Sequence, residues 1–422
     1  MSDSGSNTQK KSFLLLQGVA SPFFNQLQTA LINANQECLK VNFCGGDLFS
    51  GEYFHKSQNH INFLGSLDAL SAFYAELFTQ HQISDIALFG DTRPIHLDAI
   101  ALAKQQNINI HVFEEGYFRP NWVTLDNGGV NAYSSIYQTS QNQAEWFLQN
   151  GSNSDWQEKT QVTGGGLLIR AWHDIRFHLA SFFLKRKFFH YKTHRPDSPL
   201  AEYWGFVRRI PLVHFIYNDS ANQVIDKLLK SKTRYYLLPL QLEADSQMRL
   251  HSSFKSLAEV IETTLKSFAK FASEDSKLVI KLHPLDPWFI DYTKVIKRLL
   301  KNFNINEERV LYLEAGDLNK LLTECQGTIL VNSTVGTSAL GANCPVIALG
   351  SAIYNIDGLT FQGSLDNFWL NACPPDKAIF AAFRQCYIKH TQINGSFYNR
   401  RGIEMAVANS VKKLLNIDIF PK

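Results

Sequence analysis

Short apolar runs alternate along the chain with longer amphipathic stretches. In the first half, four runs have the length and composition of buried strands: Phe13–Leu16, Leu39–Phe43, Asp85–Phe89 and Ile108–Phe113. Residues with helical spacing separate them at Leu67–Gln80 and Leu97–Gln106, and another helix is predicted to begin near Pro22. Parallel strands need helical crossovers of this kind, so the first half is predicted to form a parallel sheet covered by helices.

The second half repeats this theme after a flexible joint at Gly164-Gly165-Gly166. Its predicted strands and late helices are Tyr235–Leu240, Leu278–Leu282, Thr328–Val331, Lys377–Tyr387 and Gly402–Leu415. A length of 422 residues leaves room for two hydrophobic cores. The pattern predicts an α/β protein of GT-B-like architecture, in which two Rossmann-type doubly wound domains face each other across a cleft.

Five segments follow from this pattern. They are a disordered polar tail at 1–11, a Rossmann-like domain at 12–163, a basic and aromatic helical segment at 164–230, a second Rossmann-like domain at 231–400 and a C-terminal helix at 401–422. Between Arg170 and Arg209, nine Lys and Arg residues stand against three Asp and Glu. Aromatic and basic residues together suit an element that lies on anionic lipid. A buried helical hairpin with snorkelling lysines is the alternative.

Composition narrows the class of protein. Hydrophobic content of 45% and charged content of 19% are typical of folded soluble chains. A net charge of +3 and the lack of a nucleic-acid-binding motif favour no nucleic-acid partner. The six cysteines form no C-x-x-C pair, which indicates reduced thiols, and no apolar stretch reaches the length of a signal peptide or membrane span. We expect a cytoplasmic protein, peripheral at the inner face of a membrane.

Polar residues follow each predicted strand of the second half. Asp245 and Gln247 come after the first, His283-Pro284 after the second, and Asn332 to Thr337 after the third. Because strand exits of an open parallel sheet gather at one edge, this edge is predicted to bind the ligand. A carboxylate, an imidazole and a hydroxyl-rich helix start suit a donor that bears a phosphate and a sugar carbon that reacts.

The turn at 332–337 is the clearest phosphate-binding candidate. Hydroxyl donors, an amide and a glycine that permits close approach occur together: Asn332, Ser333, Thr334, Gly336 and Thr337. A helix that begins here would point unpaired N–H groups and its positive end at an anion. The alternative is an ordinary N-cap.

His283 and Asp245 each allow two interpretations. Proline at 284 keeps His283 extended, so its imidazole is held in position to donate to a donor phosphate. Asp245 is a candidate nucleophile, or a stabiliser of an oxocarbenium-like transition state. The alternatives are a structural histidine and a solvated loop aspartate.

The first half supplies further charged residues at its strand exits. Glu114 and Glu115 are candidates for the second carboxylate that such chemistry uses, and Glu115 is favoured for acid/base work because it lies nearer the loop. Adjacent strand residues point to opposite faces, so at most one of them is expected to face the cleft. Arg93 or Arg119 is predicted to hold a substrate carboxylate, with an ion pair that fixes a loop as the alternative. Asp91 and Asn131 accompany them as candidate binding residues.

These stretches together resemble the KpsS/LipB family of capsule polysaccharide biosynthesis proteins, from about Phe13 to Tyr398. The resemblance rests on the order and spacing of short motifs: Leu15-Leu-Gln17-Gly18, Asn42-Phe-Cys-Gly45-Gly46-Asp47, Phe89-Gly90-Asp91-Thr-Arg93-Pro94, Phe113-Glu114-Glu115-Gly116-Tyr117, Gly128-Gly129-Val130-Asn131, Asp245-Ser246-Gln247, His283-Pro284, Asn332-Ser333-Thr334 and Gly358-Leu359-Thr360.

The resemblance implies a retaining β-Kdo glycosyltransferase that uses CMP-Kdo. Such proteins place the first Kdo on phosphatidylglycerol or lysophosphatidylglycerol, and a KpsC-type enzyme extends the linker for capsule export. Asp245 is similar in position to the family's nucleophile, and His283 with Ser333 and Thr334 would contact the CMP phosphate. In KpsC-type modules Asp stands at the position of Glu115, so the resemblance supports Glu114 more than Glu115.

The implied domain roles and partners follow. The 12–163 domain would serve the acceptor and the 231–400 domain CMP-Kdo, without cofactor or metal, since no Asp-x-Asp motif occurs. Expected partners are the inner membrane surface, a KpsC-type transferase and the capsule export complex. Alternative functions are a KpsC-like Kdo extender, another CMP-sugar transferase, or a non-catalytic capsule-export scaffold.

Overall fold

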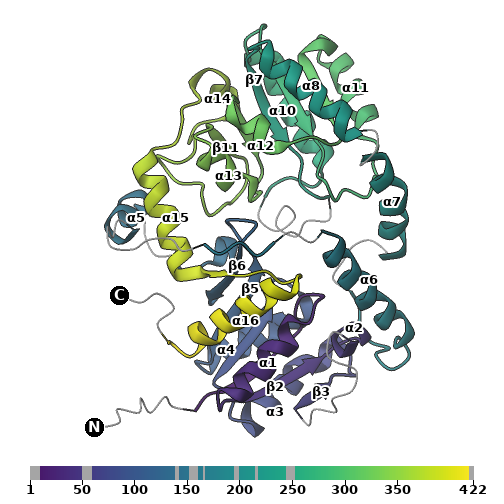
Figure 1. Ribbon diagram of the computed structural model, residues 1–422, viewed down its shortest axis with the longest axis vertical. Helices are drawn as coiled ribbons and strands as arrows, with labels where there is room; N and C mark the ends of the chain where they lie inside the picture. The colour runs from purple at the N-terminus through teal and green to yellow at the C-terminus, as the bar shows by residue number, and fades with distance from the viewer. Residues whose placement is uncertain are drawn as a thin grey trace. The chain divides into compact units, whose positions relative to one another are not determined.

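The chain forms two compact units, each built around one sheet (Figure 1). The computed structural model describes residues 10–49, 59–137, 142–151, 160–164, 167–193, 199–213, 217–243 and 252–417. Unit 1 comprises Met1–Gln138, Asn153–His194 and Tyr387–Lys422, and unit 2 comprises Thr139–Ser152 and Arg195–Cys386. The last stretch of the chain therefore returns to the unit in which the chain begins.

Unit 1 holds a seven-stranded sheet in the order β12-β6-β5-β4-β1-β2-β3. The bounds are β1 Ser12–Leu15, β2 Glu37–Asn42, β3 His60–Asn62, β4 Asp85–Phe89, β5 Asn109–Glu115, β6 Trp122–Asn127 and β12 Gln392–Asn394. β1 to β5 pair in parallel, whereas β6 runs antiparallel to β5 and β12 antiparallel to β6. The carboxyl ends of the parallel strands thus share one edge.

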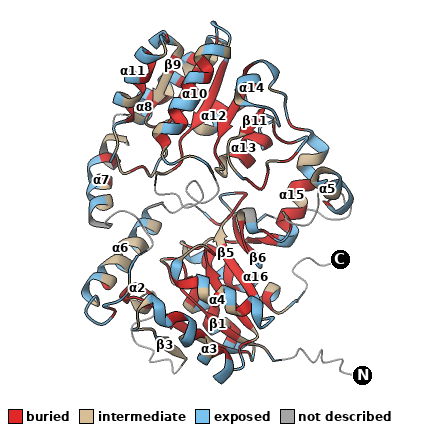
Figure 2. Cartoon of the chain, turned by 180° about the vertical axis from the view of Figure 1, so that it is seen from behind, coloured by how far each residue is buried: buried red, intermediate tan, exposed pale blue. Residues whose placement is uncertain are grey.

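Helices cover both faces of this sheet. α1 Phe23–Asn33 and α16 Arg400–Leu414 cover one face, and α3 Leu70–Gln80 and α4 Pro94–Gln105 cover the other. Unit 1 also contains α2 Gly45–Phe49, which follows β2, and α6 Leu167–Phe183, which packs against α2. Phe13 and Leu15 of β1 lie in one core with residues of α1 and α16, and Leu14 lies in another with residues of α3 and α4. Alternate strand residues point to opposite faces, so β1 is buried on both sides, as Figure 2 shows for the strands.

Unit 2 holds a five-stranded parallel sheet in the order β11-β10-β7-β8-β9. Its strands are β7 Tyr235–Pro239, β8 Lys277–Lys281, β9 Val310–Leu313, β10 Gly327–Leu330 and β11 Val346–Ala348. Its helices are α5 Gln143–Gly151, α7 Pro199–Leu212, α8 Asn218–Lys230, α10 Leu257–Phe271, α11 Tyr292–Asn302, α12 Leu318–Thr323, α13 Val335–Gly341 and α14 Leu365–Asn371; α15, Lys377–Thr391, crosses into unit 1. Every residue of β7 is buried, as expected of a central strand with helices on both faces.

The predicted α/β class with two doubly wound units is confirmed. All seven predicted strands form, with ends that differ by at most two residues, and both units are α/β with largely parallel sheets. Five strands were not predicted from the sequence: the antiparallel β6 and β12 and the short β3, β9 and β11. The proposed domain limits remain a prediction.

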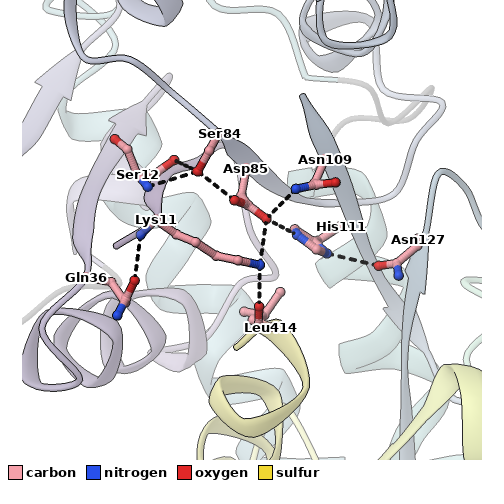
Figure 3. Close-up of polar contacts among 9 residues, drawn as sticks. All are labelled: Lys11, Ser12, Gln36, Ser84, Asp85, Asn109, His111, Asn127 and Leu414. Carbon is pink, nitrogen blue, oxygen red and sulfur yellow. Dashed lines mark hydrogen bonds and ion pairs between the residues drawn. The ribbon is translucent and has the colours of Figure 1, made fainter. Parts of the chain in front are cut away.

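A buried polar network closes the amino ends of the unit 1 strands (Figure 3). The Asp85 side chain is fully buried, and its Oδ1 accepts hydrogen bonds from His111 Nε2 at 2.7 Å and from Asn109 Nδ2 at 3.2 Å. Lys11 Nζ lies 3.4 Å from the same oxygen and donates to the carbonyl of Leu414 at the end of α16. Lys11 was assigned to the polar tail, but here it ties β4 to the last helix.

Candidate active site

Two candidate side chains of unit 1 meet beside Gly90, at the exit of β4. Gly90 has a φ of +74°, and a Cβ there would stand 3.6 Å from Glu114 Oε2 and 3.7 Å from Arg93 Nε. Glu114 comes from the end of the neighbouring strand β5, and Arg93 directly precedes α4. The structure thus brings a carboxyl group and a guanidinium together at the carboxyl edge of the sheet.

The environment of Glu114 favours a proton on its carboxyl group. Burial raises its pKa to about 7, and the negative charges of Glu115 and Asp91 act in the same direction. The backbone N–H of Glu115, which donates to Oε1 at 2.9 Å, and the charge of Arg93 oppose this rise. Glu114 therefore exchanges its proton near neutral pH, as a general acid or base must.

Glu115 is held in the opposite state. Burial by itself would raise its pKa, but Arg119, Arg170 and a hydrogen bond from Tyr398 outweigh burial and lower it. The Tyr398 hydroxyl donates to Oε1 at 2.6 Å, and Arg170 Nη1 of α6 lies 3.2 Å from the same oxygen. Adjacent carboxyl groups whose environments push their pKa values apart are typical of acid/base sites. Of the two carboxyl groups, Glu114 is the one whose pKa lies near neutral pH, and which of them acts in a reaction remains a prediction.

Arg93 is fixed by residues from the exit of β1. Its Nη1 donates to Gln17 Oε1 at 3.0 Å and to the carbonyl of Gly18 at 3.1 Å. Gln17 in turn donates to Asp47 at 3.0 Å and to the Tyr191 hydroxyl at 3.2 Å. Gln17 thus positions Arg93, a role that the sequence analysis did not give it.

The other unit 1 candidates shape the surrounding turns. Asp91 accepts the N–H of Val130 at 3.0 Å, and the N–H of Asn131 donates to the Tyr117 hydroxyl at 2.7 Å. Asn131 has a φ of 56°, a left-handed conformation that asparagine tolerates. Arg119 is exposed and donates from Nε to the carbonyl of Gly116 at 3.2 Å. Of the two arginine candidates, only Arg93 lies beside Glu114 at Gly90.

In unit 2, a reciprocal pair joins the exits of β7 and β10. Gln241 Nε2 donates to Asn332 Oδ1 at 3.0 Å, and the N–H of Asn332 donates back to Gln241 Oε1 at 3.2 Å. The strand exits meet at one edge of this sheet, as predicted.

The turn before α13 differs from the expectation of unpaired donors. The N–H of Val335 donates to Ser333 Oγ, that of Gly336 to the Ser333 carbonyl and that of Thr337 to the Thr334 carbonyl, at 3.0 to 3.3 Å. These N–H groups already have acceptors within the chain. Phosphate binding at this turn remains a prediction, and it now rests on the Ser333 and Thr334 hydroxyls.

Gly336 serves packing. A Cβ at this position would stand 2.2 Å from Cζ of Tyr354, whose hydroxyl donates to the Ser333 carbonyl at 2.6 Å. The close approach that Gly336 permits is therefore to the Tyr354 ring.

The loop that carries His283 and Pro284 is clamped by Arg209 of α7. Arg209 is 1% exposed, and its guanidinium donates to the carbonyls of Pro284 at 2.5 Å and of Asp286 and Glu314 at 3.0 Å. His283 Nδ1 accepts the N–H of Leu285 at 3.0 Å, which puts the proton of the neutral ring on Nε2. Arg209 belongs to the basic and aromatic segment at 164–230, for which lipid contact and a buried hairpin are the two interpretations, and its side chain is buried.

Two of the predicted site residues lie outside the described residues. Asp245 and Gln247 lie in 244–251, outside the described residues, and their roles remain predictions. Within the described part of the chain no group of three or more His, Cys, Asp or Glu side chains is placed to hold a metal ion. No helix there is both long enough and apolar enough to cross a bilayer.

Two sheets with polar residues at the carboxyl ends of their strands define a doubly wound α/β protein. Residues 84–398 match the family described as "Capsule polysaccharide biosynthesis protein", and the chain belongs to this family. It is 36% identical over 396 residues to the capsule polysaccharide modification protein LipB of Neisseria meningitidis serogroup B, which covers 92% of each chain. It is also 33% identical over 395 residues to the capsule polysaccharide export protein KpsS of Escherichia coli. This alignment covers 92% of this chain and 97% of KpsS. The resemblance noted from the motifs is confirmed.

Solved structures give weaker matches. The β-Kdo 2,7 transferase of KpsC from Thermosulfurimonas dismutans has a TM-score of 0.42 and 12% identity, with 96% of this chain and 99% of that chain covered. A UDP-GlcNAc 2-epimerase from Neisseria meningitidis has a TM-score of 0.31 and 14% identity, with 96% and 100% covered. At these values no site residue is assigned from them.

Proposed function

We propose that this protein is a retaining β-Kdo transferase. It moves Kdo from CMP-Kdo to phosphatidylglycerol or lysophosphatidylglycerol at the inner membrane surface and so begins the poly-Kdo linker of a capsular polysaccharide. A KpsC-type transferase and the capsule export complex would act on the product.

The observation that carries the proposal is the Glu114–Glu115 pair beside Arg93. A transferase to a lipid hydroxyl needs a base that can take the hydroxyl proton near neutral pH, and Glu114, with a pKa of about 7, has this property. Kdo carries a carboxylate next to its anomeric carbon, and Arg93 offers a fixed guanidinium within reach of the same position. Membership in a capsule polysaccharide biosynthesis family supports the sugar-transfer class.

The reaction proceeds in two displacements. The Asp245 carboxylate attacks the anomeric carbon of Kdo, the bond to the CMP phosphate breaks, and CMP leaves with the bonding electrons. The glycerol hydroxyl then attacks the same carbon, gives its proton to Glu114 and releases Asp245. Two inversions at one carbon keep the β configuration.

The remaining residues bind and orient. His283 donates from Nε2 to the leaving phosphate, with the Ser333 and Thr334 hydroxyls as further donors. Arg209 holds the loop that carries His283, and Arg93 holds the Kdo carboxylate. Glu115 stays ionised and, as a like charge, helps to keep the Glu114 pKa high.

The test is Asp245→Ala assayed with CMP-Kdo and a lysophosphatidylglycerol acceptor. We expect loss of transfer by at least a factor of about 1,000, as for other lost nucleophiles, while CMP still binds. Asp68→Ala, an exposed aspartate of unit 1, is the matched control and should transfer at the wild-type rate. Wild-type turnover in Asp245→Ala would overturn the assignment, and a capsule-positive cell carrying this variant would favour the export scaffold.

A further inference from the structure

Helix α6 of unit 1 exposes an apolar face. Leu168, Trp172, Leu179, Phe182 and Phe183 are 79%, 58%, 50%, 65% and 76% exposed. Their spacing of three, four and seven residues puts them on one side of the helix, here called the outer stripe. Large side chains exposed together on one helix mark a surface that another apolar phase covers.

The outer stripe is not the side by which α6 packs. A Cβ at Gly45 of α2 would stand 2.2 Å from the carbonyl oxygen of Ala180, and one at Gly46 would stand 2.5 Å from the Phe177 ring. The N–H of Gly46 also donates to Ser181 Oγ at 3.0 Å. α6 is therefore anchored to α2 through its opposite side, whereas the side chains of the outer stripe are exposed. Exposed and intermediate residues alternate along α6 in Figure 2.

The charge around the outer stripe distinguishes a lipid bilayer from a second copy of this chain as the partner of the stripe. From Arg170 to Lys192 the sequence has six Lys and Arg (170, 176, 185, 186, 187 and 192) and one Asp (174), an excess of five positive charges. Arg176, Lys185, Arg186 and Lys187 are all exposed. Cations at the end of an amphipathic helix suit anionic lipid headgroups, whereas an interface between two copies of this chain would bring like charges together.

The same helix reaches the candidate acidic pair. Arg170, in the first turns of α6, lies 3.2 Å from Glu115 Oε1 and covers the Tyr398 ring at 4.7 Å from its centroid. A surface on which α6 rests is thus linked to Glu115 by one side chain.

We propose that the outer stripe of α6 docks unit 1 on an anionic bilayer surface. The stripe enters the headgroup region, the cations at 185–187 contact lipid phosphates, and Arg170 keeps the Glu115 carboxylate next to the docking helix. The docking surface is defined by α6 alone and does not require that the donor is CMP-Kdo.

The experiment uses the whole chain and two kinds of vesicle, one of phosphatidylcholine alone and one that also contains roughly 30 mol% phosphatidylglycerol. In flotation at low salt, we expect binding to the anionic vesicles, weakened about fivefold for each cation removed at 185–187. Phe182→Ser/Phe183→Ser should bind at least about tenfold more weakly. Leu97→Ser, which removes a 51% exposed leucine of α4 in unit 1, should bind like the wild type.

Two results would overturn this inference. One is unchanged vesicle binding by the folded double-serine variant. The other is a wild-type chain that ignores anionic vesicles and elutes as a dimer that the variant dissociates, which would assign the stripe to a second copy. Transfer to a short-chain, monomeric lysophosphatidylglycerol separates this proposal from the proposed function, because the double-serine variant should keep that activity.

Discussion

Arg209→Met tests how the loop after β8 is held. Three backbone carbonyls, those of Pro284, Asp286 and Glu314, receive hydrogen bonds from one buried guanidinium. Hydrogen bonds from a charged donor contribute about 1.5 kcal/mol each or more, and the substitution leaves all three acceptors without this donor.

Two effects reduce this loss. The guanidinium no longer has to be buried, a cost that is reflected in the lowered pKa of Arg209, for which burial is the main cause. Methionine also keeps an apolar contact with Trp288, over whose ring the guanidinium now lies at 5.6 Å. We therefore expect a net loss of about 3 kcal/mol in the free energy of unfolding of unit 2.

The assay is urea unfolding of the full chain followed by circular dichroism. With a slope of about 3 kcal/mol per molar urea, the midpoint of the affected transition should fall by about 1 M. Arg208→Met is the matched control, because Arg208 is the exposed neighbour on the same helix and should change stability by less than about 0.5 kcal/mol. Equal midpoints for the two variants would refute the clamp.

Three further predictions concern other parts of the structure. Transfer should rise with pH through about 7 as Glu114 loses its proton, and Glu115→Gln should move this midpoint of kcat/KM to lower pH by removing a like charge; an unshifted midpoint would contradict the pairing. Burial would raise the pKa of Asp85, but hydrogen bonds from His111 and Ser84 and the charges of His111 and Lys11 outweigh it and lower this pKa in the folded protein. The ionised Asp85 carboxylate therefore stabilises the fold above the ordinary carboxyl pKa, and this stabilisation is lost as the pH falls below about 4. Asp85→Asn should cost about 2 kcal/mol at pH 7 and flatten this acid limb in thermal melts, whereas Asp68→Asn should do neither. Gly336→Ala should destabilise unit 2 by about 2 kcal/mol because the added Cβ would collide with the Tyr354 ring. Gly341→Ala in the same helix is the control, since a Cβ there has its nearest neighbour at 3.7 Å. Equal denaturation midpoints for the two alanine variants would disprove the contact.

The local pattern of the sequence was sufficient for the fold class and the strand exits. Runs such as Ile86–Phe89 are apolar throughout because both faces of the strand are covered, and this is visible without a structure. The return of the chain to unit 1 was not predictable in this way. β12 is only three residues long and gains its place by pairing with β6, a contact across more than 260 positions.

The sequence pointed to Glu114 and Glu115 as candidate residues, whose role in a reaction remains a prediction, but it did not indicate the ionisation states of their carboxyl groups. Strand alternation separates Glu114 from Glu115, but it does not reveal that Tyr398, 283 positions away, donates to Glu115 and helps to keep it ionised. Arg209 shows the same limit, because a basic residue among aromatic ones is equally compatible with a lipid surface and with a buried clamp. Contacts with residues far away in the sequence determine the ionisation of Glu115 and the burial of Arg209, and the local sequence does not reveal such contacts.

The most direct measurement is mass spectrometry of a fluorescent lysophosphatidylglycerol incubated with CMP-Kdo and either the wild-type protein or Glu114→Gln. We expect a lipid heavier by one Kdo with the wild type and at least about 100-fold less product with Glu114→Gln at pH 7. Several added Kdo residues would contradict the initiating role. Equal product from both proteins would contradict the assignment of Glu114 as the base, and no lipid product from the wild type would contradict the proposed reaction itself.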